Sequence, residues 1–202
     1  MQKKLALVLA LAILVGTLCT GCLFNIFQTA RTIGAGNVAF TLGTGFFTID
    51  VEDETSAYVT PQARLAVGLA DGIDLGLQSG AMVAVPGGDP GWLGLVGDLK
   101  FSLFDEPESF ALALGFGGGY SVEFVGTGWG VFGEIFLDSN LRVLPIFFAY
   151  QPGIPIGGDS FVLLHHFAGG LKLKLSEQTR LLVQGDVRGG LLSVGLALEI
   201  GF

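Results

Sequence analysis

The stretch Ser193-Val194-Gly195-Leu196-Ala197-Leu198-Glu199-Ile200-Gly201-Phe202 decides the fold of this chain. Its large apolar side chains fall at every second position, and the positions between them carry small or polar residues. Successive side chains of a β-strand point to opposite faces. The stretch therefore predicts a strand with one apolar face and one small or polar face.

Nine upstream stretches show weaker forms of the same alternation. They cover residues 38–49, 60–69, 73–85, 93–104, 110–124, 130–137, 141–150, 161–175 and 180–188. The stretch at 141–150 is the weakest, because Pro145 cannot donate a hydrogen bond to a neighbouring strand and predicts a bulge or an early strand end. The sequence predicts about ten strands, with eight as the alternative if this stretch and the one before it are irregular.

An all-β closed antiparallel transmembrane barrel over residues 37–202 accounts for these strands. Lipid requires every backbone polar group to be paired, so strands cross a membrane only as a closed barrel. The last strand is then expected to pair with residues 180–188 on one side and 38–49 on the other. A soluble lipocalin-like barrel is the alternative, with its apolar face turned inward. The near absence of charge on the apolar face favours the membrane.

The aromatic last residue gives the closing strand a further meaning. An apolar series that ends on Phe202 resembles the carboxy-terminal signature of bacterial outer-membrane β-barrels, which their assembly machinery reads. That resemblance implies a location in the cell outer membrane, with outer-membrane lipids and the barrel-assembly machinery as partners. The residues that carry the predicted assembly signal are Val194, Leu196, Leu198, Ile200 and Phe202.

The first 21 residues are predicted to be a signal peptide, with Lys3 and Lys4 before an apolar core. Thr20-Gly21-Cys22 resembles the end of a lipobox, which implies cleavage before Cys22 and its acylation, with palmitate for example. The match departs where Cys19 replaces the usual leucine, so a plain secretory signal is the alternative. Residues 22–36 are then a lipidated linker, with residues 24–27 at the membrane surface.

The connections between strands alternate in length. Short polar turns at residues 70–72, 105–109, 138–140 and 176–179 lie on the side of both termini, and longer connections at 51–59, 86–92, 125–129 and 151–160 lie on the other. Bacterial barrels have short periplasmic turns and long outer loops, which predicts a periplasmic amino terminus. An outer aromatic girdle is expected at Phe46, Phe47, Trp92, Tyr120 and Trp129.

Charges of both signs lie on the small and polar face, which points into the lumen. Such confined charges must pair, so we expect an ion-paired network that fills the lumen and leaves no open channel. Arg188 is the nearest candidate partner for Glu199. The glycines and alanines of this face allow the alternative of a narrow pore or small-solute binder. The predicted lumen network is Arg64, Asp74, Asp98, Lys100, Glu134, Arg142, Lys172, Lys174, Asp186, Arg188 and Glu199.

Catalysis has little support in the sequence. His165 and His166 lie near the predicted outer rim, close to Asp159 and Ser160, at the level where omptin proteases and lipid A deacylases carry a histidine. No matching motif surrounds them, and neighbouring residues of a strand face opposite ways. An outer-rim enzyme therefore stays a minor alternative, and we expect no metal or cofactor.

The charge balance bears on the partners. Removal of residues 1–21 leaves 8 of the 10 basic side chains and all 18 acidic ones, a formal charge of −10. This argues against nucleic acid, which needs clustered lysine and arginine. We expect a monomeric structural or interaction barrel without enzymatic activity.

Overall fold

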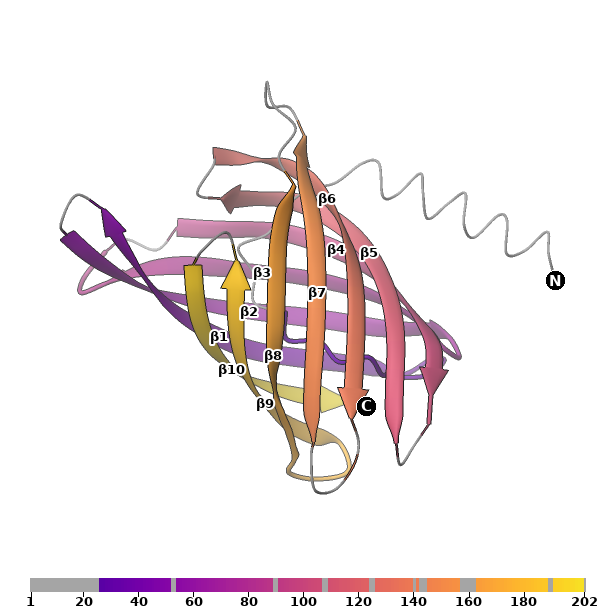
Figure 1. Cartoon of the computed structure of the whole chain (residues 1–202). Coiled ribbons are helices and arrows are strands. Elements are labelled where there is room, and N and C mark those ends of the chain that lie inside the picture. Colours follow the sequence, from indigo (N-terminus) through magenta and orange to yellow (C-terminus); the bar gives the residue numbers. More distant parts are fainter. Residues whose placement is uncertain are drawn as a thin grey trace.

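Ten antiparallel strands close into a barrel in the computed structural model of the chain (Figure 1). The structure describes residues 26–51, 54–88, 91–106, 109–123, 126–139, 141, 145–156, 163–188 and 191–201. The predicted signal peptide, Cys22, Arg142 and Phe202 lie outside these residues. Among the residues described, no helix is long and apolar enough to span a membrane.

The strands follow one another around the barrel in chain order, and each pairs with its sequence neighbours. Their bounds are β1 Val38–Val51, β2 Glu54–Ala70, β3 Ile73–Val85, β4 Gly91–Asp105, β5 Phe110–Glu123, β6 Gly126–Ser139, β7 Ile146–Ile156, β8 Leu164–Lys174, β9 Thr179–Arg188 and β10 Leu191–Gly201. We call the end that carries the connections β2–β3, β4–β5, β6–β7 and β8–β9 the turn end, and the opposite end the loop end.

The carboxy-terminal strand closes the barrel as the sequence predicts. Leu198 of β10 lies opposite Leu181 of β9 and opposite Leu42 of β1, so β10 is hydrogen-bonded on both sides. The prediction of ten strands is confirmed, and the alternative of eight is excluded.

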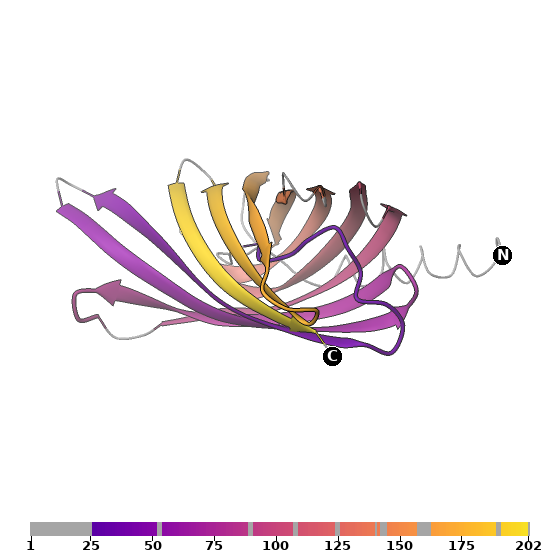
Figure 2. The same ribbon diagram turned by 90° about the horizontal axis from the view of Figure 1, so that it is seen from below.

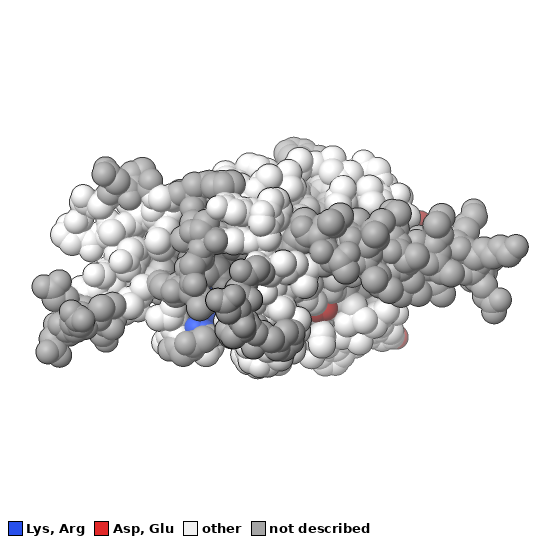
Figure 3. All heavy atoms as spheres, turned by 90° about the horizontal axis from the view of Figure 1, so that it is seen from above, with Lys and Arg blue, Asp and Glu red and all other residues white. Residues whose placement is uncertain are grey.

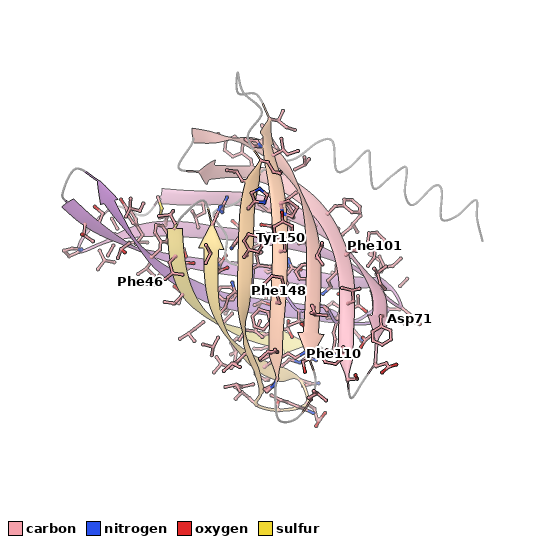
Figure 4. The ribbon with its side chains drawn as sticks, viewed as in Figure 1. Phe46, Asp71, Phe101, Phe110, Phe148 and Tyr150 are labelled. Carbon is pink, nitrogen blue, oxygen red and sulfur yellow. The ribbon has the colours of Figure 1, made fainter. Side chains whose placement is uncertain are left out.

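The apolar faces of the strands point outward, away from the lumen. Val194 and Leu196 of β10 are 56% and 52% exposed, whereas Gly195 and Ala197, which alternate with them, are buried. Phe46, Phe110 and Phe148 likewise extend away from the barrel wall (Figure 4). Seen from above, the described surface carries very few charged side chains (Figure 3). A soluble lipocalin-like barrel would bury this face, so the fold is that of a membrane barrel.

The loop end differs from the prediction in its details. β1 and β2 continue as a paired hairpin up to Val51 and Glu54, where the sequence predicts a long loop at residues 51–59. At the turn end β7 begins only at Ile146, directly after Pro145, so the stretch predicted at 141–150 starts late instead of bulging or ending early. Trp129 and Phe46 are exposed as girdle residues should be, but Phe47 is buried because it faces the lumen.

Candidate functional site in the barrel lumen

Residues 26–37, which we call the N-terminal segment, run from the interior of the barrel, where residues 26–30 are buried, to its rim, where residues 35–37 are exposed, before the chain enters β1. This segment is the indigo trace that runs between the walls in Figures 1 and 2. Ile26, Phe27 and Ala30 are almost fully buried. The prediction of an external linker with residues 24–27 at the membrane surface is therefore wrong for Ile26 and Phe27, because the lumen supplies the apolar surroundings that membrane lipid was expected to supply.

The two buried large apolar side chains of the segment enter different parts of the wall. Ile26 and Ala30 pack in a buried cluster made by strands β5 to β8, whose wall residues are Ala111, Ala113, Phe136, Ala149 and Ala168. Phe27 packs against Phe147, Leu182 and Ala197 of β7, β9 and β10. Together the two contacts connect the segment to six of the ten strands.

Polar contacts hold the rest of the segment near the turn end. Lys100 of β4 donates to the backbone carbonyls of Thr29 and Arg31 over 3.1 and 2.7 Å, and its Nζ lies 3.2 Å from Asp74 Oδ2. Asp74 in turn accepts the backbone N–H of Ile33 over 3.1 Å. The Arg31 guanidinium lies 2.7 Å from Asp105 Oδ1. One ion pair therefore lies on the wall beside the segment, and the other joins the segment to the end of β4.

The wall has small residues where the segment passes. A side chain on Gly43 would collide with the Phe27 ring, and a side chain on Gly68 would collide with the carbonyl oxygen of Gly34. The backbone N–H of Gly68 donates to Asn37 and its carbonyl accepts from Gly36, both over 2.9 Å. Gly43 and Gly68 therefore make room for the N-terminal segment, whereas the sequence left open that such glycines leave a passage for a solute.

A polar layer crosses the middle of the lumen. The Arg64 guanidinium lies 2.6 Å from Asp98 Oδ1, and both side chains are more than 90% buried. Gln151 donates to Glu134 over 3.0 Å, and Gln78 donates to Gln62 over 2.7 Å. Buried charges are tolerated when they are paired and hydrogen-bonded, which this layer achieves for Arg64 and Asp98.

The layer continues to β8 and β9. His166 Nε2 lies 2.8 Å from Asp186 Oδ1, and Gln184 donates to the same oxygen over 2.6 Å. Arg188 lies opposite His166 in the strand register. Toward the loop end, Leu93, Val96 and Phe132 form a buried apolar cluster. The described lumen is thus filled at three levels: apolar at the loop end, polar in the middle, and occupied by the N-terminal segment below.

Two further ion pairs line the turn end, and one partner of each is absent from the predicted lumen network. Lys172 lies 2.7 Å from Asp138, which was assigned to a turn although it shares the face of Glu134. Arg180 lies 3.1 Å from Glu199. The expected partner Arg188 is wrong, because the antiparallel register places it opposite Leu191 at the other end of β9.

Lys174 does not belong to the buried network. It is the last residue of β8, its side chain is 60% exposed, and its ammonium lies 2.7 Å from the Glu177 carboxylate in the following turn. That hydrogen bond lowers the pKa of Glu177 from its ordinary value. The strand alternation assigned Lys174 to the lumen face, but the lumen ends before this residue.

A cavity of about 270 Å³ remains beside the N-terminal segment. Its walls come from the segment, from β1 to β4 and from the β8–β9 turn with the adjoining parts of β9 and β10. Arg64, Lys100 and Arg180 line it together with Asp74 and Glu199, so both signs of charge are present. With Arg31 and Glu177 included, four basic and three acidic side chains line this hydrophilic space within the turn end.

The two histidines lie on opposite faces of β8. His166 points into the lumen toward Asp186, whereas His165 lies on the outer face, with its Nδ1 2.8 Å from the Tyr150 hydroxyl. Tyr150, labelled in Figure 4, also stacks on Phe167 at 4.6 Å and on His165 at 6.0 Å between ring centroids, so the three rings form an aromatic row. Asp159 and Ser160 lie outside the described residues. Among the described residues, no group of three or more His, Cys, Asp or Glu could hold a metal ion.

Comparison with known proteins finds likeness only among solved structures. No family model and no curated protein matches the chain. The N-terminal β-barrel domain of Pseudomonas aeruginosa OprF is 15% identical, with 84% of this chain and 99% of that one covered at a TM-score of 0.37.

Two other structures are similar in the same way. The outer membrane protein OprG from Pseudomonas aeruginosa is 12% identical, with 85% of this chain and 99% of that one covered at a TM-score of 0.38. The outer membrane protease OmpT from Escherichia coli is 11% identical, with 82% and 96% covered at a TM-score of 0.42. At these values the likeness says nothing of activity, ligand or partner.

Proposed function

We propose that this protein is a small outer-membrane barrel with a structural or interaction role, whose lumen is closed to solutes by its own N-terminal segment. The observation that supports this most is the burial of Ile26, Phe27 and Ala30 between lumen-facing residues of the wall. The middle polar layer adds a second barrier, because Arg64, Asp98 and Glu134 are almost fully buried.

Single-channel recording in planar bilayers tests the closed lumen. We expect the purified protein to insert without producing steady conductance steps, because the segment and the ion-paired layer occupy the lumen at two levels. An open porin of known conductance serves as the control for insertion. Steady, reproducible unitary currents from the wild-type chain would show that the narrow-pore alternative is correct.

The lipid anchor and the orientation belong to the same proposal. Ile26 packs with Ala111, the second residue of β5, at the turn end of the barrel. Cys22 stands four residues before Ile26, a reach of at most about 14 Å for an extended chain. An acyl chain on Cys22 would therefore attach close to the barrel, on the side of the short turns that we assign to the periplasm.

Palmitate labelling combined with membrane fractionation checks the anchor. We expect label in the outer-membrane fraction for the wild-type chain and none for Cys22→Ser, with both proteins requiring detergent for extraction. Cys19→Ser is the matched control and should keep the label. If the wild-type protein carries no label, the signal peptide is a plain secretory one and Cys22 is not acylated. If the protein is released without detergent, the membrane barrel itself is refuted.

We further propose that the chain carries out no catalysis. His165 and His166 diverge to opposite faces of β8, so the two imidazoles cannot act on one substrate. Replacement of both histidines is expected to leave lipid A structure and peptide cleavage in whole cells unchanged.

A further inference from the structure

The N-terminal segment is bound in the lumen much as a peptide ligand is bound in a receptor. It is not a strand of the barrel sheet. Two adjacent side chains, Ile26 and Phe27, insert into two separate apolar recesses of the wall. The recess around Ile26 is built largely from alanines, whose small side chains leave volume for an inserted residue.

The polar contacts to the segment read its backbone. Lys100 binds the carbonyls of Thr29 and Arg31, and Asp74 binds the N–H of Ile33. The segment itself is irregular, with a hydrogen bond from the Gln28 N–H to the Ile26 carbonyl and a bend at Ala30, and any peptide that adopts this backbone offers the same groups. Lys100 and Asp74 are themselves almost fully buried and paired with each other, so they are held ready on the wall. Selectivity must then come from side chains, namely the two apolar residues and Arg31 at Asp105.

We propose that the turn-end half of the lumen is a peptide-binding site, and that residues 26–37 are its resident ligand. The site takes a peptide of the same irregular backbone, in which a bulky aliphatic residue precedes an aromatic residue and a cation follows four positions after the aromatic residue. A peptide of this chemistry supplied in trans replaces the resident segment. The inference rests on the interaction role proposed above and names the class of its partner, whereas the conductance of the barrel does not bear on it.

Competition in the intact protein tests the exchange. The full chain with Cys19→Ser, Cys22→Ser and Ala30→Cys places a single thiol on the segment, at a residue that is 0% exposed. The probe is a synthetic peptide with the sequence of residues 23–37, and the readout is the rate of labelling by a charged thiol reagent. We expect the peptide to raise this rate at least tenfold in a saturable manner, because the bound peptide prevents the resident segment from rebinding in the lumen.

A matched wall position separates exchange from unfolding. Ala113→Cys in the same background places the thiol on β5, where Ala113 is also 0% exposed and is covered by either ligand. Its labelling should stay slow when the peptide is added. A peptide in which the residues equivalent to Ile26 and Phe27 are alanine should have no effect at Ala30→Cys.

Hydrogen exchange on the unaltered chain gives a second test that needs no variant. The peptide should speed exchange at the amides of Ile33 and Gly36, which donate to Asp74 and Gly68, while strand amides keep their protection. The proposal is overturned if labelling and exchange ignore the peptide. It is equally overturned if the peptide raises the labelling rates of Ala30→Cys and Ala113→Cys together, because the binding site then opens only when the barrel unfolds.

Discussion

Arg64→Met is expected to lower the free energy of unfolding of the barrel by about 3–5 kcal/mol, because it leaves a buried carboxylate without its partner. Asp98 is 2% exposed at its side chain, and its Oδ1 lies 2.6 Å from the Arg64 guanidinium. Methionine keeps much of the volume of the arginine stem, so the cost reports lost charge pairing more than lost packing. Urea unfolding in lipid vesicles, followed by tryptophan fluorescence, measures the change.

Two companion variants make the interpretation specific. Arg180→Met breaks the Arg180–Glu199 pair at the turn end, where the arginine side chain is 39% exposed, and should cost at most about 1 kcal/mol. Arg64→Met combined with Asp98→Leu removes both buried charges and should recover most of the stability. If the double variant is as unstable as Arg64→Met alone, the arginine stabilises the lumen through packing and the buried-charge explanation is wrong.

The wall of the barrel was predictable because its signal is local. Alternation over a few residues specifies which side chains share a face, and the uninterrupted pattern of β10 specifies which face meets lipid. Exposure of Val194 and Leu196 beside buried Gly195 and Ala197 follows directly from that pattern. The same rule explains the error at Phe47, since adjacent aromatic residues of one strand cannot both belong to an outer girdle.

The interior was harder to predict because it depends on register between strands. Glu199 pairs with Arg180 because β9 and β10 are offset as they are, and a single strand pattern does not contain that offset. Asp138 could have been predicted, since Glu134, Phe136 and Asp138 stand at alternate positions and so share one face of the strand. It was assigned to a turn because β6 was expected to end before it.

The N-terminal segment was missed for a different reason. Residues 26–37 have no strand or helix period, so nothing local places them in a lumen. The sequence feature that could have indicated it is the small side-chain volume on the lumen face. Lumen-facing positions near the turn end are occupied by small residues, namely Ala39, Gly43, Ala66, Ala111, Ala113, Ala149, Ala168 and Ala197. Protein interiors are close-packed, so a wall this small requires something to fill the space inside it.

Phe27→Ala is therefore expected to cost about 3–5 kcal/mol, as for other buried aromatic residues, because the Phe27 ring fills the recess between Phe147, Leu182 and Ala197. Phe27→Leu keeps a large apolar side chain in that recess and should cost much less. Gly43→Ala attacks the same contact from the wall, since its new methyl group collides with the Phe27 ring. The effects of Phe27→Ala and Gly43→Ala should be less than additive, because removal of the ring removes that collision.

Adding Ile26→Ala to Phe27→Ala separates a structural core from a bound ligand. If the segment is an inseparable part of the core, the second substitution lowers the free energy of unfolding by about a further 2–5 kcal/mol, the usual range for a buried isoleucine. If the segment binds as a ligand does, the loss stops at the free energy of its detachment, and the double variant unfolds with the stability of the empty barrel. In the urea titration the free energy of unfolding then falls no further from the single to the double variant. A thiol at Ala30→Cys is also labelled rapidly, because it is buried only while the segment is bound in the lumen. A full additive loss without such labelling would contradict detachment and leave the segment as ordinary core.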